Sequence, residues 1–312
     1  MNSHFSKKII SIFIPMLCFT FVASAEGKKT ITLALNWKAE PQFGGFYQTQ
    51  LEKKIPLKIL EGGSGTPTIQ MLSFGKVDAA VVSAEEILIS NAQNPQNPVV
   101  ALFAVFQTNP QIWMTRQDRG FHSIADVLNH PGLVAAQSGL TYVQFLKKKY
   151  PHSKVQWVPY SGGIAGLINE KNYTQQGFLT SEPLLAEEKG IKVSTFLIAD
   201  EGFNPYTTVL AVRKSDLKSK RQEILKWVEA IRKGWEDYLK NPLPANQLMG
   251  QINTSMDAKT FQKSSELQKK LIEAKSLGSM TEKRWDSLIQ TLVRLKILAH
   301  PLKAQDQFIN LK

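Results

Sequence analysis

The chain has almost no cysteine. The single one among its 312 residues is Cys18, which lies within the first 25 residues. Without further thiols, the remainder can form no disulfide, no thiol nucleophile and no cysteine-based metal site. A chain of this length does not depend on disulfides, because it is long enough to bury a substantial apolar core.

Metal-binding and hydrolytic motifs are also missing. No His-Glu-x-x-His pair, Gly-x-Ser-x-Gly turn or EF-hand loop occurs. The histidines after residue 25 have no metal-ligand spacing and lie in polar contexts typical of a surface; they are His122, His130, His152 and His300. We therefore expect no metal, no cofactor and no catalytic residues.

Long runs of like charge are absent, although the net charge is +12. The longest such run is Lys147-Lys148-Lys149, and after residue 213 basic residues alternate with acidic ones. A strongly basic chain can bind nucleic acid or anionic membranes, but such proteins concentrate the charge. We interpret the charge as a solvated basic surface and expect no nucleic-acid partner.

Apolar runs are short, and the longest lies near the N-terminus. Lys7 and Lys8 precede the apolar run 9–22, and Ala23-Ser24-Ala25 has the small-x-small pattern of a signal-peptidase site. The run is shorter than the roughly 20 residues that cross a membrane. We expect residues 1–25 to be a signal peptide cleaved after Ala25, with export to the periplasm. An uncleaved membrane anchor is the alternative.

Strand-like and helix-like segments alternate up to about residue 210. We expect strands at 31–35, 57–60, 78–82, 99–106, 112–115, 133–136, 155–158, 177–179, 193–198 and 208–212. Helical patterns lie between them at 67–74, 84–91, 123–128, 140–149, 162–169 and 183–188. This order predicts an α/β fold with mainly parallel sheets. From Leu217 onward helices predominate, at about 217–240, 257–274 and 281–295, with a break at 241–244.

Residues 33–50 are the most informative segment. A buried strand ends near Leu35, Trp37 follows, and Glu40-Pro41 begins a helix that contains Phe43. Proline suits a first helical turn, because its missing N–H would be unpaired there. Ligands of open α/β sheets bind outside the carboxyl ends of strands. Trp37 is therefore a candidate ligand contact, and a core aromatic that caps the strand is the alternative.

The same arrangement occurs a second time. The strand at 177–179 leads through Thr180-Ser181 into Glu182-Pro183 and a helix. Each half of the α/β region thus carries a glutamate, Glu40 or Glu182, at the start of a helix. We predict two lobes that present these loops to a shared cleft. The alternative interpretation is a catalytic carboxylate pair, as in sugar hydrolases, but nothing else in the chain completes such a site.

Two strands are expected to connect the lobes. The segment 111–115 leaves the first lobe, and 207–213 returns to it. The turns Asn109-Pro110 and Asn204-Pro205 precede them. We expect lobe I to comprise 26–116 and 207–312, with the C-terminal helices, and lobe II to comprise 117–206. Such crossings are places for a hinge.

Several loops that follow strands carry glycine or serine. The loop 61–67 includes Ser64 and Gly65, and its glycines allow a close backbone approach to a ligand. Ser83, Ser138 and Ser161 each follow a strand and precede a helix. Each serine is equally explained as a helix N-cap, and the glycine loop as a flexible turn. Together, the loops fit a cleft lined with hydroxyls and helix N-termini.

The chain resembles the periplasmic substrate-binding proteins of ATP-driven (ABC) importers, in the branch with the thiamine-pyrimidine binders. The nitrate, taurine and alkanesulfonate binders are more distant. The matching segments are 35–37, 40–47, 62–64, 75–80, 177–183 and 188–190. The resemblance spans about residues 30–240, and it implies a type II two-lobed fold that closes on its ligand. Residues 51–56 depart from the branch, because they are shorter than its usual turn.

The resemblance also implies a function and a site. We expect a monomeric protein that binds a small aromatic or heterocyclic nutrient and passes it to a membrane permease. A thiamine pyrimidine precursor is favoured, and riboflavin-like rings, nitrate or sulfonates are alternatives. Trp37 would stack on the ring, and Glu182, ionised at its helix N-terminus, would accept N–H bonds. The candidate ligand-binding residues are Trp37, Glu40, Gln42, Phe43, Ser64, Gly65, Ser83, Ser138, Ser161, Glu182 and Tyr206.

Two other functional classes remain open. The branch includes enzymes that make the thiamine pyrimidine from an active-site histidine, with a cysteine-rich motif and iron. This chain has no cysteine after Cys18 and no histidine between residue 25 and His122. We therefore expect no enzyme activity. A sensory or partner-binding module with the same fold is the other alternative.

Overall fold

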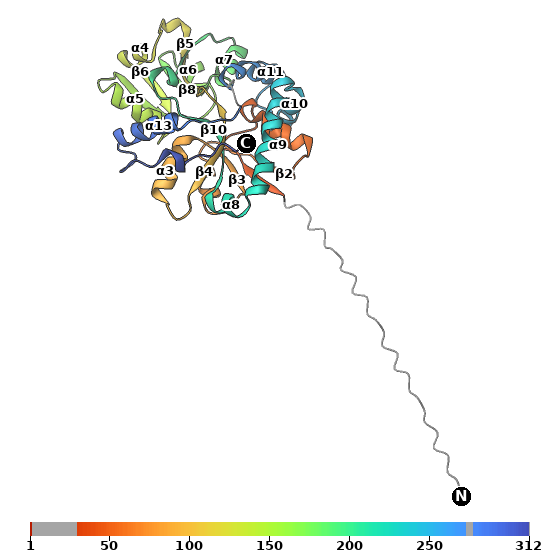
Figure 1. The fold of residues 1–312 in the computed structure, drawn as a ribbon. Helices are drawn as coiled ribbons and strands as arrows, with labels where there is room; N and C mark the ends of the chain where they lie inside the picture. The colour runs from red at the N-terminus through yellow and green to blue at the C-terminus, as the bar shows by residue number, and fades with distance from the viewer. Residues whose placement is uncertain (2–29, 273–276, 312) are drawn as a thin grey trace.

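The computed structural model describes Met1 and residues 30–272 and 277–311. The expected signal peptide, residues 1–25, lies outside the described residues apart from Met1. Within the described residues, no helix is long and apolar enough to cross a membrane. Figure 1 shows two groups of elements, one around β5, β6 and β8 and the other around β3, β4 and α9.

The strands of the described chain form two five-stranded sheets with the same order. The first sheet contains, in spatial order, β2 (Leu57–Leu60), β1 (Ile31–Ala34), β3 (Ala79–Val82), β10 (Thr207–Arg213) and β4 (Val99–Phe106). The second contains β7 (Val155–Pro159), β6 (Gly132–Ala136), β8 (Tyr173–Phe178), β5 (Gln111–Arg116) and β9 (Val193–Leu197). All ten agree with the strands expected from the sequence, except that β8 begins four residues earlier.

Each sheet contains one antiparallel strand, which is the strand that has just crossed between the sheets. β10 runs antiparallel to β3 and β4, and β5 runs antiparallel to β8 and β9. The remaining pairs are parallel, so the sheets are mixed rather than wholly parallel. Because β5 belongs to the second sheet, we propose that lobe I ends near residue 110 and that lobe II comprises 111–206.

Helices cover both sheets. The α-helices are α1 (Gly44–Glu52), α2 (Thr68–Ser73), α3 (Ala84–Gln93), α4 (Ile124–Asn129), α5 (Thr141–Lys149), α6 (Ala165–Asn169), α7 (Glu182–Glu188), α8 (Lys214–Ser219), α9 (Arg221–Lys240), α10 (Leu243–Ile252), α11 (Ala258–Leu267), α12 (Lys269–Ile272) and α13 (Glu282–Arg294). The 3-10 turns are η1 (Pro41–Phe43), η2 (Gln117–Arg119), η3 (Ile198–Glu201) and η4 (Ala304–Asp306). The sequence did not predict α10, because prolines on either side of Leu243 suggested only a break. A proline is tolerated in the first helical turn.

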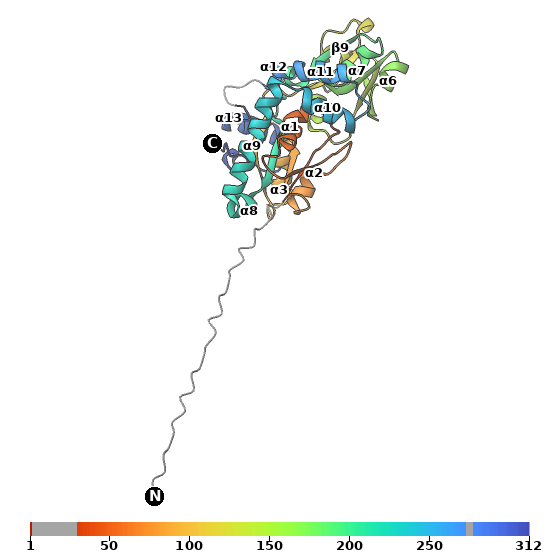
Figure 2. The ribbon, with the colours of Figure 1, turned by 90° about the vertical axis from the view of Figure 1, so that its right-hand side faces the viewer.

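The helix after Trp37 packs unusually close to α9. A Cβ atom on Gly44 would lie 2.0 Å from the Tyr238 ring, and one on Gly45 would lie 2.2 Å from the Trp235 ring. Both rings are fully buried in the core of the first lobe. Figure 2 shows α1 lying beside α9. The two glycines therefore hold the start of α1, and with it the end of the Trp37 loop, against the long helix.

This close contact predicts a large stability difference between two helical glycines. Gly45→Ala should lower the free energy of unfolding by about 1–3 kcal/mol, because the methyl group overlaps a buried ring. Gly250→Ala in α10 is the matched control, since its Cβ would lie 3.6 Å from Phe261, an ordinary contact. It should be neutral or stabilising by up to about 1 kcal/mol. Urea denaturation of both variants measures the difference, and equal losses would contradict it.

The C-terminal helices contact both lobes. α11 packs against α7 of the second lobe and against η1 of the first, and Lys263 on α11 pairs with Glu187 on α7 at 2.7 Å. α13 packs against α3, and its Arg284 donates to the Asn204 carbonyl before β10 and to the Gln107 carbonyl after β4. One arginine thus holds both crossings between the sheets.

Backbone strain is stored where the chain returns to the first sheet. Thr208, the second residue of β10, has φ of +52°. β-branched residues rarely adopt this left-handed conformation, which costs about 1–3 kcal/mol and is often found at functional sites. Thr208 is buried and lies at the base of the cleft described below. The strained residue therefore lies where the chain crosses back from the second sheet to the first.

Candidate functional site

A cleft of about 590 Å³ lies between the carboxyl ends of the two sheets. Loops that follow β1, β2 and β3 line one side, and loops that follow β6, β7 and β8 line the other. Carboxyl ends of parallel strands meet at one edge of a sheet, where ligands of α/β proteins bind. The beginnings of β5 and β10, the crossing strands, contribute Gln111, Thr207 and Thr208 to the lining.

Eight of the eleven predicted ligand-binding residues line this cleft. They are Trp37, Glu40, Gln42, Ser64, Gly65, Ser83, Ser138 and Glu182. The cleft therefore brings together residues from both halves of the α/β region, as the repeated strand–glutamate–proline–helix arrangement suggested.

The other three predicted residues lie elsewhere. Phe43 is fully buried in the core and does not line the cleft. Ser161 is exposed, and its neighbour Tyr160 lines the cleft instead. Tyr206 is buried at the crossing, where its hydroxyl accepts a hydrogen bond from the Thr281 N–H at 3.0 Å. We therefore leave these three out of the proposed site.

The position of Trp37 is compatible with both interpretations that the sequence left open. The half-buried side chain packs against the core of the first lobe and also lines the cleft. The glycine loop lies close beside it, because Gly62 donates its N–H to the Trp37 carbonyl at 3.1 Å. A Cβ atom on Gly62 would lie 2.1 Å from the Leu35 carbonyl oxygen, so only glycine permits this approach. The main chain of Trp37 is thus held against the glycine loop while its side chain lines the cleft.

Glu182 is held rigidly on the other side of the cleft. Its Oε2 accepts the Phe178 N–H at 2.7 Å, and its Oε1 accepts the Tyr160 hydroxyl at 3.1 Å. Gly177 leaves room for this carboxylate, since a Cβ there would lie 3.1 Å from Oε2. The carboxylate is therefore oriented before any ligand arrives, which lowers the entropy lost on binding.

Burial raises the pKa of both predicted glutamates, and the charge of Glu182 raises that of Glu40 further. Burial, and then the negative charge of Glu182, raise the pKa of Glu40 to about 8, while polar contacts from Ser181 and Trp37 act in the opposite direction. Burial also raises the pKa of Glu182, although the Phe178 N–H opposes this. The sequence predicted an ionised Glu182, but burial outweighs the helix N-terminus. Both carboxyl groups therefore hold a proton more readily than a glutamate in solution does.

The raised pKa of Glu40 predicts how stability depends on pH. Between pH 4.5 and about 8, the folded protein binds this proton and the unfolded chain does not. The free energy of unfolding should therefore fall as pH rises through this window, by up to about 1.4 kcal/mol per pH unit. Urea denaturation at pH 5, 6.5 and 8 measures the slope. Glu40→Gln should reduce the slope by up to about 1.4 kcal/mol per pH unit, and burial that likewise raises the pKa of Glu85 to about 8 supplies a similar slope that remains. An unchanged slope in Glu40→Gln would contradict the assignment.

Several cleft residues escaped the sequence analysis. Gln137 Nε2 donates to Ser64 Oγ at 2.8 Å, which joins the two lobes at the mouth of the cleft. Tyr142, Tyr160 and Gln176 line the second lobe. Glutamine and tyrosine are common on surfaces, so only their positions just after β6 or β7, or at the end of β8, offered a signal.

The cleft is acidic. Among the described residues that line it are four glutamates, Glu40, Glu85, Glu86 and Glu182, and no lysine, arginine or histidine. No group of three or more histidine, cysteine, aspartate or glutamate side chains in the described chain could hold a metal ion. The arrangement favours ligands that donate hydrogen bonds or carry positive charge over anions.

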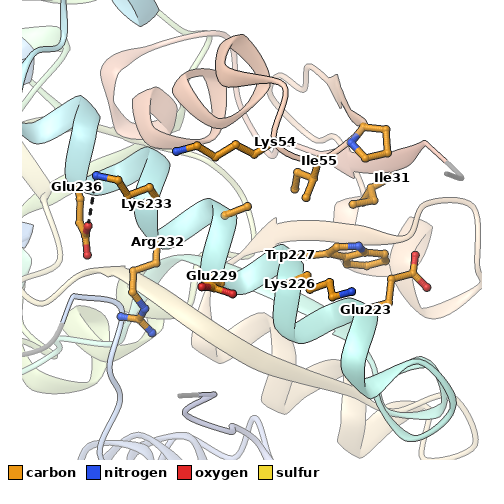
Figure 3. Close-up of a pocket in the computed structure, with 12 residues that line it drawn as sticks. Ile31, Lys54, Ile55, Glu223, Lys226, Trp227, Glu229, Arg232, Lys233 and Glu236 are labelled. Atoms are coloured by element: carbon orange, nitrogen blue, oxygen red, sulfur yellow. Dashed lines mark ion pairs between the residues drawn. The ribbon is translucent and has the colours of Figure 1, made fainter.

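A second, larger groove runs along α9 on the first lobe. Figure 3 shows Trp227 and Ile31 at its floor and charged side chains at its rim, where Lys233 pairs with Glu236. Its volume is about 880 Å³. No loop from the second lobe lines it, so a change in lobe separation would not close it. It lacks the convergent polar groups of the cleft between the lobes.

The sequence and the structure were compared with known proteins. A family model described as NMT1/THI5 like matches residues 42–245. No curated protein sequence matches the chain.

Several solved structures share the fold of this chain at low sequence identity. The ligand-binding component of an ABC-type import system from Staphylococcus aureus, with zinc bound, has a TM-score of 0.67 at 12% identity, covering 90% of this chain and 97% of that one. The aliphatic sulphonate-binding protein of Escherichia coli has a TM-score of 0.68 at 11% identity, covering 91% and 92%. A Candida albicans protein with the generic periplasmic binding protein fold has a TM-score of 0.63 at 16% identity, covering 91% and 98%. The two-lobed fold expected from the sequence is therefore confirmed.

Proposed function

Because the chain belongs to the NMT1/THI5-like family, we propose that it is the solute-binding component of an ABC importer. The observation that carries this proposal is the cleft, where eight predicted residues from two lobes meet around a pair of buried carboxyl groups. The crossings at 107–110 and 202–206 are the hinge about which the lobes would close. The protein would work as an exported monomer, with cleavage after Ala25, and would deliver its ligand to a membrane permease.

We propose a small nitrogen heterocycle as the ligand, with a thiamine pyrimidine precursor favoured. The indole of Trp37 provides a flat surface for stacking. Glu182 and Glu40 provide acceptors for ring or exocyclic N–H groups, and these bonds strengthen when the carboxylate is ionised. A riboflavin-like ring is the next candidate, because it also combines a flat surface with polar edges.

Nitrate and sulfonates fit the cleft less well. Relatives of this fold include a sulphonate-binding protein, but an anion needs a cationic side chain or several free N–H groups. The lining that the structure describes has four glutamates and no basic side chain. We therefore propose that this chain has diverged from the anion binders in ligand class while keeping the fold.

We propose a binding role without catalysis. A pyrimidine-forming enzyme would consume a histidine and use iron, but the described lining contains no histidine and the described chain has no metal-ligand group. The carboxyl groups of Glu40 and Glu182 contact the hydroxyl groups of Ser181 and Tyr160, and no histidine or lysine in the described lining completes a catalytic arrangement with them. Ligand binding instead shifts the balance between open and closed lobes.

Thermal denaturation of the purified protein tests this proposal. The probes are 4-amino-5-hydroxymethyl-2-methylpyrimidine, riboflavin, nitrate and taurine. A ligand at 100 times its dissociation constant adds about 2.7 kcal/mol to the free energy of unfolding, which is readily detected. Stabilisation by the pyrimidine supports the proposal. Stabilisation by nitrate or taurine alone would overturn the heterocycle, and iron-dependent pyrimidine formation would overturn the binding role.

A further inference from the structure

Glu85 is the one glutamate of the cleft whose position the fold does not explain. It lies in the first turn of α3, beside the N-cap Ser83. The capping box is completed by Glu86, whose Oε2 accepts the Ser83 N–H at 2.7 Å and the Ser83 hydroxyl at 3.0 Å. The helix start is therefore satisfied without the carboxyl group of Glu85.

The Glu85 carboxyl group is nevertheless buried in the lining of the cleft. Its Oε2 has almost no accessible surface and no hydrogen-bond partner. Burial raises the pKa of this group to about 8, although its own N–H and the Ser83 hydroxyl oppose the shift. A buried polar atom without a partner costs free energy, and few persist in native proteins without a role.

Two further polar atoms in the same cleft have no partner. The Tyr142 hydroxyl belongs to a side chain that is 2% exposed, and it makes no hydrogen bond. Burial raises the pKa of this hydroxyl, the nearby Trp113 indole opposes the shift, and the charge of Glu182 adds to it. Gln111 Oε1, at the start of β5, is also buried and unpaired. Glu85 Oε2, the Tyr142 hydroxyl oxygen and Gln111 Oε1 are thus three cleft atoms that can each accept a hydrogen bond.

The described protein does not supply the missing donors. No lysine, arginine or histidine is among the described residues that line the cleft, so any positive charge must come from the ligand. The charge of Glu182 acts on Glu40, whereas the carboxyl group that acts on Glu85 is that of Glu86. The cleft thus holds two separate acidic positions.

We propose that Glu85 forms a subsite for a protonated amine, so that the ligand is a flat nitrogen heterocycle with an amine-bearing arm. An ammonium group has three donors, which suits Glu85 Oε2, a buried acceptor without a partner in the lining of the cleft. The ring part of this proposal rests on the proposed function, in which Trp37 and Glu182 bind the heterocycle. The subsite itself rests on Glu85.

Matched amine and alcohol probes test the subsite. The probes are 4-amino-2-methylpyrimidines that carry at C5 an arm of one, two or three methylenes, ending in an amine or in a hydroxyl group. In calorimetric titration at pH 7, the amine should bind at least about 10-fold more tightly than the alcohol for one arm length, since charge-assisted hydrogen bonds are stronger. Glu85→Gln should reduce this preference to less than about 2-fold.

Glu187→Gln is the control, because Glu187 is exposed and does not line the cleft. It should keep the amine preference. Equal binding of amines and alcohols by the native protein would overturn the subsite and leave the proposed function standing. If Glu85→Gln still prefers the amine to the alcohol, the subsite is also overturned and the proposed function stands.

Diaminoalkanes of two to five carbons separate the two proposals when no pyrimidine binds. Loss of pyrimidine binding with Glu85-dependent diamine binding would overturn the heterocycle and keep the amine subsite. If neither class binds, both proposals are wrong. Titration with Ca²⁺ completes the test, because Glu85-dependent binding of Ca²⁺ without any amine binding would show a metal position and overturn the amine subsite.

Discussion

Glu182→Gln should weaken the binding of an aminopyrimidine by about 100- to 1000-fold, or about 3–4 kcal/mol. The carboxylate is buried, oriented by the Phe178 N–H and the Tyr160 hydroxyl, and aimed into the cleft. An amide has almost the same shape but no charge, and it presents a donor where the ligand also presents one. Calorimetric titration with 4-amino-5-hydroxymethyl-2-methylpyrimidine measures the loss.

The same variant should not destabilise the empty protein. Glutamine keeps an oxygen for the Phe178 N–H and removes a carboxyl group whose pKa burial raises. Glu187→Gln is the control, because Glu187 lies on the same helix but is exposed and pairs with Lys263 at 2.7 Å outside the cleft. It should leave affinity within about 2-fold, since exposed ion pairs contribute little. Loss of stability with unchanged affinity in Glu182→Gln would return Glu182 to a structural role.

Arg284→Met should lower the free energy of unfolding by about 2–4 kcal/mol. Arg284 donates to the Asn204 carbonyl and to Asn204 Oδ1, both at 2.9 Å, and to the Gln107 carbonyl. Its guanidinium also lies 3.9 Å from the centre of the Tyr206 ring. Methionine keeps much of the volume but leaves these half-buried acceptors without a donor. Urea denaturation measures the loss.

Arg232→Met is the control that separates an effect on stability from an effect on the hinge. Arg232 donates to the Leu277 and Leu311 carbonyls and lies 5.4 Å from the Phe103 ring centre, away from both crossings. Both variants should be less stable, but only Arg284→Met should change the rate of lobe closure in stopped-flow ligand binding. Equal closure rates in the two variants would show that Arg284 stabilises the fold without controlling the hinge.

The sequence was a good guide to strands that bury apolar side chains and a poor guide to polar ones. β4 reads as a continuous apolar run and was predicted with its observed limits. β8 was predicted only from Gly177, because Thr174, Gln175 and Gln176 look like a surface segment. In the structure Thr174 Oγ1 accepts from Arg119 at 2.9 Å, and Gln175 donates to the Gly163 carbonyl at 2.8 Å. These partners are distant in sequence, so no local pattern could have indicated them.

The residues of the candidate site also fall into those that local sequence patterns predicted and those that they did not. Trp37, Glu40 and Glu182 were found because each lies just after a strand and at the start of a helix, where main-chain geometry directs residues to the sheet edge. Phe43 follows Glu40 by three residues but belongs to the core, because η1 turns its ring away from the edge. Glu85 was missed because a glutamate in a first helical turn is ordinarily explained by capping.

The sequence by itself determined the order of elements, the two lobes with their crossings and the kind of side chain at each strand end. These features depend on local periodicity and turn chemistry, which act over a few residues. Only the tertiary structure decided that Glu182 lies near enough to raise the pKa of Glu40, that Glu85 Oε2 has no hydrogen-bond partner and that no basic side chain lines the described cleft. Charge state depends on burial and on neighbours from distant segments, and only the folded chain brings these together.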